Sequence, residues 1–200
     1  MTTHNDVPRI PDSDWLEARF GKGSLWRPAD AELPEKLTDH GSRTFLTTVG
    51  YPSVQIDVIN FDSSDLRDDT DCGAMQPFDA DELYGRRHHD DESPPVNFCF
   101  AVGTFYDQQL MLDAAGGRVD HYDPNGWDHA DGYQGAAASS LATLALLLGL
   151  VAERREALEA ATGDARTAVA TELRDRMIET EPLVADSDFW LEVFEYLLDQ

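Results

Sequence analysis

The residues best suited to chemistry gather in one stretch, GGRVDHYDPNGWDHADG, which runs from Gly116 to Gly132 and holds four aspartates and two histidines. A calcium loop of the helix-loop-helix kind needs oxygen ligands at positions one, three and five, glycine at six and a bidentate acid at twelve. With Gly126 at position six, His121 would stand at position one and Gly132 at position twelve. Neither end supplies a side-chain oxygen, so the spacing argues against such a loop.

A zinc site needs histidines that share one face or cysteines in close pairs. His121 and His129 are separated by a turn and by Trp127, and the two cysteines, Cys72 and Cys99, form no paired motif. We expect both cysteines to be small buried hydrophobic residues. A metal-dependent hydrolase remains an alternative, and its ligands and acids would be Asp120, His121, Asp123, Asp128 and His129.

Local motifs for covalent catalysis and phosphate binding do not occur. The chain has no Gly-x-Ser-x-Gly nucleophile elbow and no His-x-Glu with Pro-Cys-x-x-Cys pair of the zinc deaminases. GKGSLW, which starts at Gly21, has Trp26 where a dinucleotide fingerprint needs glycine. A triad assembled from distant residues would leave no such signature. The motifs give no indication of a cofactor or a metal site, and we predict neither.

The elements around the acidic stretch indicate what it can do. QLMLDA and RVDHYD flank Ala115 to Gly117, where glycines supply the positive φ that a tight hairpin turn needs. Arg118 to Tyr122 should therefore be a return strand, with Asp120 and His121 on opposite faces. The following PNGWDHADGYQG has no periodicity and is predicted to be a loop, anchored by Trp127 and Tyr133 and free to contact a partner.

Helices are predicted on both sides of a run of strands. DSDWLEARFG indicates a short helix capped by Ser13 or Asp14, and TDHGSRTFLTTVG a second one capped by Thr38 or Asp39. Val54 to Phe61 and Val96 to Val102 have the residue types and near alternation of strands, with Gly103 marking a bulge.

From Ser139 onward the apolar spacing is helical. A terminal apolar stripe should pack on the core: Phe189, Trp190, Val193, Phe194, Leu197 and Leu198. The order predicts one α+β domain over residues 1–200, with N-terminal helices, a central and mainly antiparallel sheet of about five or six strands, and C-terminal helices packed on it.

The charge of the chain restricts its partners. Thirty-nine acids against 15 bases give a formal net charge of -24, and such a surface repels nucleic-acid backbones and anionic membranes. It attracts basic proteins, although a surface adapted to high salt would look the same, since only Lys22 and Lys36 are lysines. The N-terminus lacks the pattern of a secretory signal, and the apolar run from Leu141 to Val151 is too short to cross a bilayer. We therefore expect a cytoplasmic protein.

Three segments together resemble a known family. LTDHGSRTFLTTVGYP, LMLDAAGGRVDHYDP and AAASSLATLALLLGLV are similar to the capped helix, the glycine hairpin and the serine-capped helix of SUKH-superfamily immunity proteins of the fourth group. The double serine, Ser139 and Ser140, is the most characteristic part. The resemblance covers about Trp15 to Ala152. It departs from the family at Tyr51, where leucine is usual, and in the alanines before Ser139, where asparagine is common.

The resemblance implies an α+β domain without catalysis. Members bind and neutralise toxins of bacterial polymorphic toxin systems, often nucleases or nucleic-acid deaminases. The expected partner is thus a basic cognate toxin, with no direct nucleic-acid or membrane binding. A regulatory or adaptor scaffold of the same superfamily is the alternative, and an exposed apolar patch would favour it. The partner-binding residues predicted from the acidic loops are Asp62, Asp65, Asp68, Asp69, Asp71, Asp90, Asp91, Glu92, Asp128 and Asp131.

Overall fold

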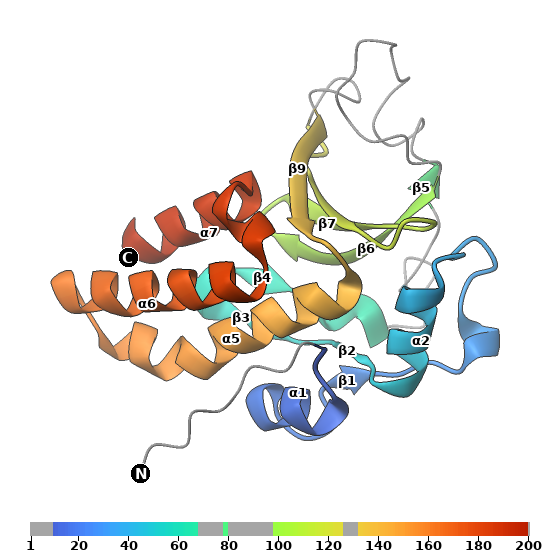
Figure 1. Cartoon of the computed structure of the whole chain (residues 1–200), viewed down its shortest axis with the longest axis horizontal. Coiled ribbons are helices and arrows are strands. Elements are labelled where there is room, and N and C mark those ends of the chain that lie inside the picture. The colour runs from blue at the N-terminus through green and yellow to red at the C-terminus, as the bar shows by residue number, and fades with distance from the viewer. Residues whose placement is uncertain (1–9, 68–77, 80–97, 126–131, 200) are drawn as a thin grey trace.

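A computed structural model describes residues 10–67, 78–79, 98–125 and 132–199 (Figure 1). The helices are α1 (Ser13–Phe20), α2 (His40–Thr48), α5 (Leu141–Ala160), α6 (Asp164–Thr180) and α7 (Asp188–Asp199). The strands are β1 (Leu25–Trp26), β2 (Tyr51–Pro52), β3 (Gln55–Ile56), β4 (Phe61–Asp62), β5 (Phe78–Asp79), β6 (Phe98–Phe105), β7 (Gln108–Asp113), β8 (Val119–Tyr122) and β9 (Tyr133–Ala138). Short 3-10 turns are η1 (Asp30–Glu32), η2 (Asp57–Ile59), η3 (Ser64–Arg67) and η4 (Pro182–Ala185).

The predicted α+β class is confirmed. Within the described residues, seven strands form one antiparallel sheet in the order β3-β4-β6-β7-β8-β9, and β5 pairs with the same edge of β6 as β4 does. Strands β1 and β2 form a separate pair. Helices α5, α6 and α7 lie side by side next to the sheet, and α1 and α2 lie below and beside it in Figure 1. The apolar face of the sheet and the buried sides of these helices form one core.

The two N-terminal helices form as predicted, with a different cap on the first. The carboxylate of Asp12, rather than Ser13 or Asp14, accepts a hydrogen bond from a free N–H in the first turn of α1, that of Trp15, at 2.8 Å. Asp39 caps α2 by accepting from the backbone N–H of Ser42 at 2.6 Å. Both caps supply an acceptor to an N–H that has no partner inside its helix.

Helix α1 is fixed against α5 by a close approach at a glycine. A Cβ on Gly149 would lie 2.4 Å from the Trp15 ring, so only glycine lets this indole pack on α5. The Arg19 guanidinium stacks on the same indole, 3.5 Å from the Trp15 ring centroid, and pairs with Glu153. Glu153 also pairs with Arg176 at 2.6 Å, which links α1, α5 and α6.

The central hairpin matches the sequence prediction. Strands β7 and β8 pair with Leu110 opposite His121 and Met111 opposite Asp120, and Gly117 in the turn has φ +74°. The predicted irregularity at Gly103 is also present, because the register of β6 against β7 shifts there and a Cβ would lie 2.6 Å from the Phe61 ring.

The predicted single strand over Val54 to Phe61 is wrong. This segment folds as β3 and β4 around η2, with Asn60 in the left-handed region at φ 49°. The consecutive residues Val58 and Ile59 are both buried. A strand sends consecutive side chains to opposite faces, whereas the turn places both of them in the core.

The loop predicted over Pro124 to Gly135 is wrong at its end, since β9 begins at Tyr133. The Gly and Ala residues of β9 have low strand propensity, so the pattern gave no signal. Their small size serves packing instead: Ala137 and Ala138 are fully buried under the C-terminal helices. Trp127, which was predicted to anchor the loop, lies outside the described residues.

Candidate functional site

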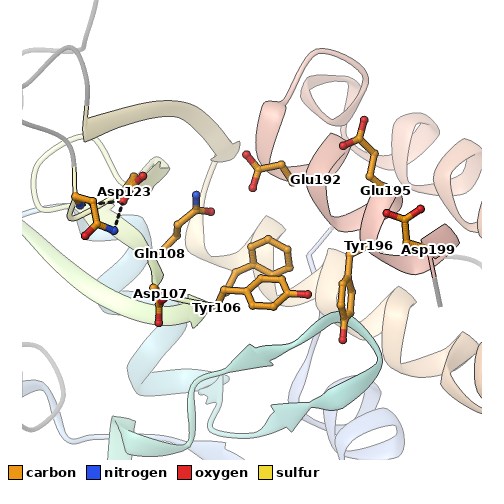
Figure 2. A pocket seen from close by; sticks show the side chains of 10 residues that line it. Tyr106, Asp107, Gln108, Asp123, Glu192, Glu195, Tyr196 and Asp199 are labelled. Atoms are coloured by element: carbon orange, nitrogen blue, oxygen red, sulfur yellow. Dashed lines mark hydrogen bonds between the residues drawn. The ribbon is translucent and has the colours of Figure 1, made fainter.

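A cavity of about 490 Å³ lies between the β6–β7 turn and the outer face of α7 (Figure 2). Two tyrosines, Tyr106 and Tyr196, line it from segments far apart in the sequence. The charged residues that line the cavity are all acidic: Asp107, Asp123, Glu192, Glu195 and Asp199.

Helix α7 supplies three of these carboxylates because of its helical period. Glu192, Glu195 and Asp199 recur at intervals of three and four residues, so they share one face of the helix. The opposite face is buried in the core through Trp190 and Val193. The predicted apolar stripe is therefore confirmed, except that Leu198 is 49% exposed and stands beside the acidic face together with Leu191, which is 46% exposed.

Hydrogen bonds to β9 hold α7 in place. Trp190 Nε1 donates to the carbonyl of Ala137 at 2.8 Å, and the hydroxyl of Ser187 donates to the carbonyl of Ala136 at 2.7 Å. From α6, Arg166 Nε donates to the carbonyl of Leu197 at 2.6 Å. The acidic face is thus presented by an element fixed at both ends.

The β6–β7 turn presents an aromatic ring to the cavity. Tyr106 adopts the left-handed backbone conformation at φ 52° and is 53% exposed. Its ring stands edge to face with Phe105, at 4.9 Å between centroids, and with Tyr196 at 5.3 Å. These contacts fix the ring while a large part of it faces solvent.

The carboxylates of the cavity have no described cation to neutralise them. The ion pairs formed among residues 10–67, 78–79, 98–125 and 132–199 all involve other acids. Partial burial, and then the charges of Asp188, Glu195 and Asp123, raise the pKa of Glu192 above its usual range. The cavity is therefore a region of concentrated negative charge.

His121 lies behind the cavity wall. It is fully buried, and its Nε2 donates to Oε1 of Gln108, a lining residue, at 2.6 Å. Its ring also stands edge to face with Phe189 at 5.2 Å. Burial lowers the pKa of His121 to about 4, against the opposing influence of Asp123 and Asp188. The imidazole is thus neutral in the folded protein at neutral pH.

This shift predicts an acid sensitivity. The unfolded chain takes up a proton on His121 below its ordinary pKa of 6.5, whereas the folded chain does so only near 4. The contribution that a neutral His121 makes to the free energy of unfolding is therefore complete above pH 6.5. About 3 kcal/mol of stability is lost as the pH falls from there to about 4. We expect His121→Phe, which cannot be protonated, to lose this part of the pH dependence in urea unfolding. Parallel pH profiles of the two proteins would contradict the assignment.

Asp120 lies on the opposite face of β8, as predicted. Its buried carboxylate pairs with Arg118 Nε at 2.7 Å, and burial raises the pKa of Asp120 to about 6 despite that guanidinium. His121 faces Phe189 and the core instead. In the described part of the chain, no three His, Cys, Asp or Glu residues are grouped to hold a metal ion. Asp128 and His129 of the hydrolase alternative lie outside that part.

Of the predicted partner-binding residues, the structure describes two. The Asp62 carboxylate accepts hydrogen bonds from Gln55 Nε2 at 2.7 Å and from the backbone and hydroxyl of Ser64, which lower its pKa although partial burial opposes them. Asp65 is exposed on η3. Neither lines the cavity. The others lie outside the described residues: Asp68, Asp69, Asp71, Asp90, Asp91, Glu92, Asp128 and Asp131.

The sequence prediction named one residue of the cavity, Asp123 of the hydrolase alternative, but did not group it with the other lining residues. Two signals could have indicated them: the regular spacing of Glu192, Glu195 and Asp199 on α7, and the Tyr106-Asp107 pair between two predicted strands. Each is also typical of an ordinary solvated surface. Among the described residues, no helix has the length and apolar character needed to cross a membrane.

Comparison with known proteins agrees with the arrangement of the elements. The family model of the SUKH-4 immunity protein matches residues 11–196, from the start of α1 into the C-terminal turn of α7. No match was found among curated proteins or among solved structures. The family match extends beyond the segments that carry the sequence resemblance and includes the helix that forms one wall of the cavity. The chain belongs to the SUKH-4 immunity protein family.

Proposed function

We propose that this immunity protein neutralises its cognate toxin by binding alone, through the acidic face that α7 and the β6–β7 turn form around the cavity. The observation that carries the proposal is the set of five lining carboxylates without a described cation. Such a face is complementary to a basic surface on the toxin.

The charge also favours a class of toxin. Enzymes that act on nucleic acids bind a polyanion, and their clefts carry lysines and arginines for that purpose. An inhibitor with a net charge of -24 can occupy such a cleft and exclude the substrate. We therefore propose a nuclease or a nucleic-acid deaminase as the toxin. Inhibition of this kind needs no reaction step in the immunity protein.

The exposed leucines of α7 support the same face as an interface. Leu191 and Leu198 are each about half exposed, beside the acidic residues of the helix. Apolar side chains next to charged ones are typical of protein interfaces. The same leucines also fit the second candidate function, that of an adaptor that binds its partner by apolar contact. The two functions differ in how the affinity for the partner depends on salt.

Salt should weaken the complex with the toxin. We expect co-expression with the protein encoded immediately upstream to relieve a growth defect and to give a complex that co-purifies. Its dissociation constant should rise at least about tenfold between about 50 and about 500 mM salt, because screening weakens the attraction between opposite charges. Isothermal titration at several salt concentrations measures this. An affinity that does not change with salt would contradict the electrostatic mechanism and favour the adaptor.

A further inference from the structure

We propose that the cavity is a receptacle for one arginine side chain of the toxin, whose guanidinium stacks on Tyr106 and pairs with carboxylates of α7. This inference rests on the proposed function and specifies the chemistry of the contact. The cavity itself, the exposed aromatic ring at its edge and the charge around it support this proposal.

The aromatic wall is preorganised for a planar group. Tyr106 is held by its turn and by the rings of Phe105 and Tyr196, yet it is 53% exposed. Tyr106, Leu191 and Leu198 are three of the four exposed large hydrophobic residues in the described part of the chain, and all lie on the β6–β7 turn or on α7. A ring fixed in this way loses little conformational entropy when a ligand stacks on it.

The carboxylates line the same cavity from two sides. Asp107 lies in the β6–β7 turn and Asp123 follows β8, while Glu192, Glu195 and Asp199 come from α7 (Figure 2). Partial burial, and then the charges of Asp188, Glu195 and Asp123, raise the pKa of Glu192. A cation between them would replace this repulsion by attraction, so the site favours a positively charged occupant.

The protein itself shows how this combination binds arginine. At the α1–α5 contact, the Arg19 guanidinium stacks on the Trp15 ring and pairs with the Glu153 carboxylate. The cavity offers the same two partners, an aromatic ring and a carboxylate on a neighbouring helix, without a described cation. A guanidinium can stack and form two parallel hydrogen bonds at once, whereas a lysine ammonium acts as a point charge. The geometry therefore favours arginine over lysine.

The test uses two probes of equal charge on the full chain. Acetyl-arginine amide and acetyl-lysine amide are titrated while NMR follows the ring signals of Tyr106 and the side-chain amide of Gln108. We expect the arginine probe to bind in the millimolar range and at least about threefold more tightly than the lysine probe. Tyr106→Ala should weaken arginine binding at least about fivefold, and Tyr106→Phe, which keeps the ring, should preserve it. Equal binding of the two probes, or no effect of Tyr106→Ala, would overturn the receptacle.

The toxin complex separates this inference from the proposed function. Tyr106→Ala should weaken toxin binding at least about tenfold, while Tyr106→Phe should leave it nearly unchanged. A complex that is sensitive to salt and indifferent to Tyr106→Ala would overturn the receptacle and leave the proposed function standing. A complex that is indifferent to salt, with arginine still bound at the cavity, would overturn the proposed function instead.

Discussion

Glu192→Lys and Glu195→Lys, introduced together, should abolish neutralisation of the toxin while the chain stays folded. The two substitutions change the charge at the cavity by four units, so that three carboxylates and two lysines line it in place of five carboxylates. They remove most of the attraction for a basic partner and place two cations on the face of α7 that the partner would approach. We expect the affinity for the toxin to fall at least about a hundredfold, an effect of the size found for close charge pairs across interfaces. Glu195 is exposed and Glu192 is only partly buried beside other acids, so lysine at either position relieves repulsion. Growth protection and isothermal titration measure the result.

A matched control has the same change in net charge elsewhere on the molecule. Glu35 and Glu156 are exposed, they lie before α2 and on α5, and neither lines the cavity. Glu35→Lys with Glu156→Lys should lower the affinity only through the overall field of the protein, by less than about tenfold. Equal losses in the two double variants would mean that no particular face binds the toxin.

The parts of the fold that were predictable from sequence are those with local chemical signals. The hairpin of β7 and β8 has glycine at its turn and apolar residues at strand spacing, and Gly117 does take the positive φ. Helices α2 and α5 have capping side chains, Asp39 and Ser140, at their first free N–H groups. Such signals act over a few residues, so one sequence is enough to read them.

The parts that were not predictable depend on tertiary contacts. The last four residues of strand β9 are glycine and alanine, which lack strand propensity, and its position is set by the packing of α7 on Ala137 and Ala138. The cavity joins Tyr106 and Tyr196, and no periodicity relates residues so far apart in the chain. The acids of α7 have the spacing of any solvated helix face. Only the fold shows that they line a cavity together with Tyr106.

The anchoring of α7 gives the largest expected effect on stability. Trp190 is fully buried, stands edge to face with Phe189 at 4.8 Å between centroids, and donates its indole N–H to Ala137 of β9 at 2.8 Å. Trp190→Ala removes the side chain and leaves a cavity in the core. We expect the free energy of unfolding to fall by about 4 kcal/mol, the usual cost of truncating a buried tryptophan. Urea unfolding followed by circular dichroism measures the loss.

Two further variants separate the contributions to this anchor. Trp190→Phe keeps most of the apolar packing and removes the hydrogen bond, leaving the buried carbonyl of Ala137 without its donor, so we expect a loss of about 2 kcal/mol. Leu191→Ala, on the next residue of the same helix, should cost less than about 1 kcal/mol because Leu191 is 46% exposed. If Trp190→Ala and Leu191→Ala were equally stable, α7 would not be held by the contact with β9.

The anchor of α7 should also affect toxin binding. Glu192 and Glu195 project from the turns next to Trp190, so a weaker contact with β9 should let the carboxylates of the acidic face move apart. We therefore expect Trp190→Phe to bind the toxin more weakly, although residue 190 touches no partner.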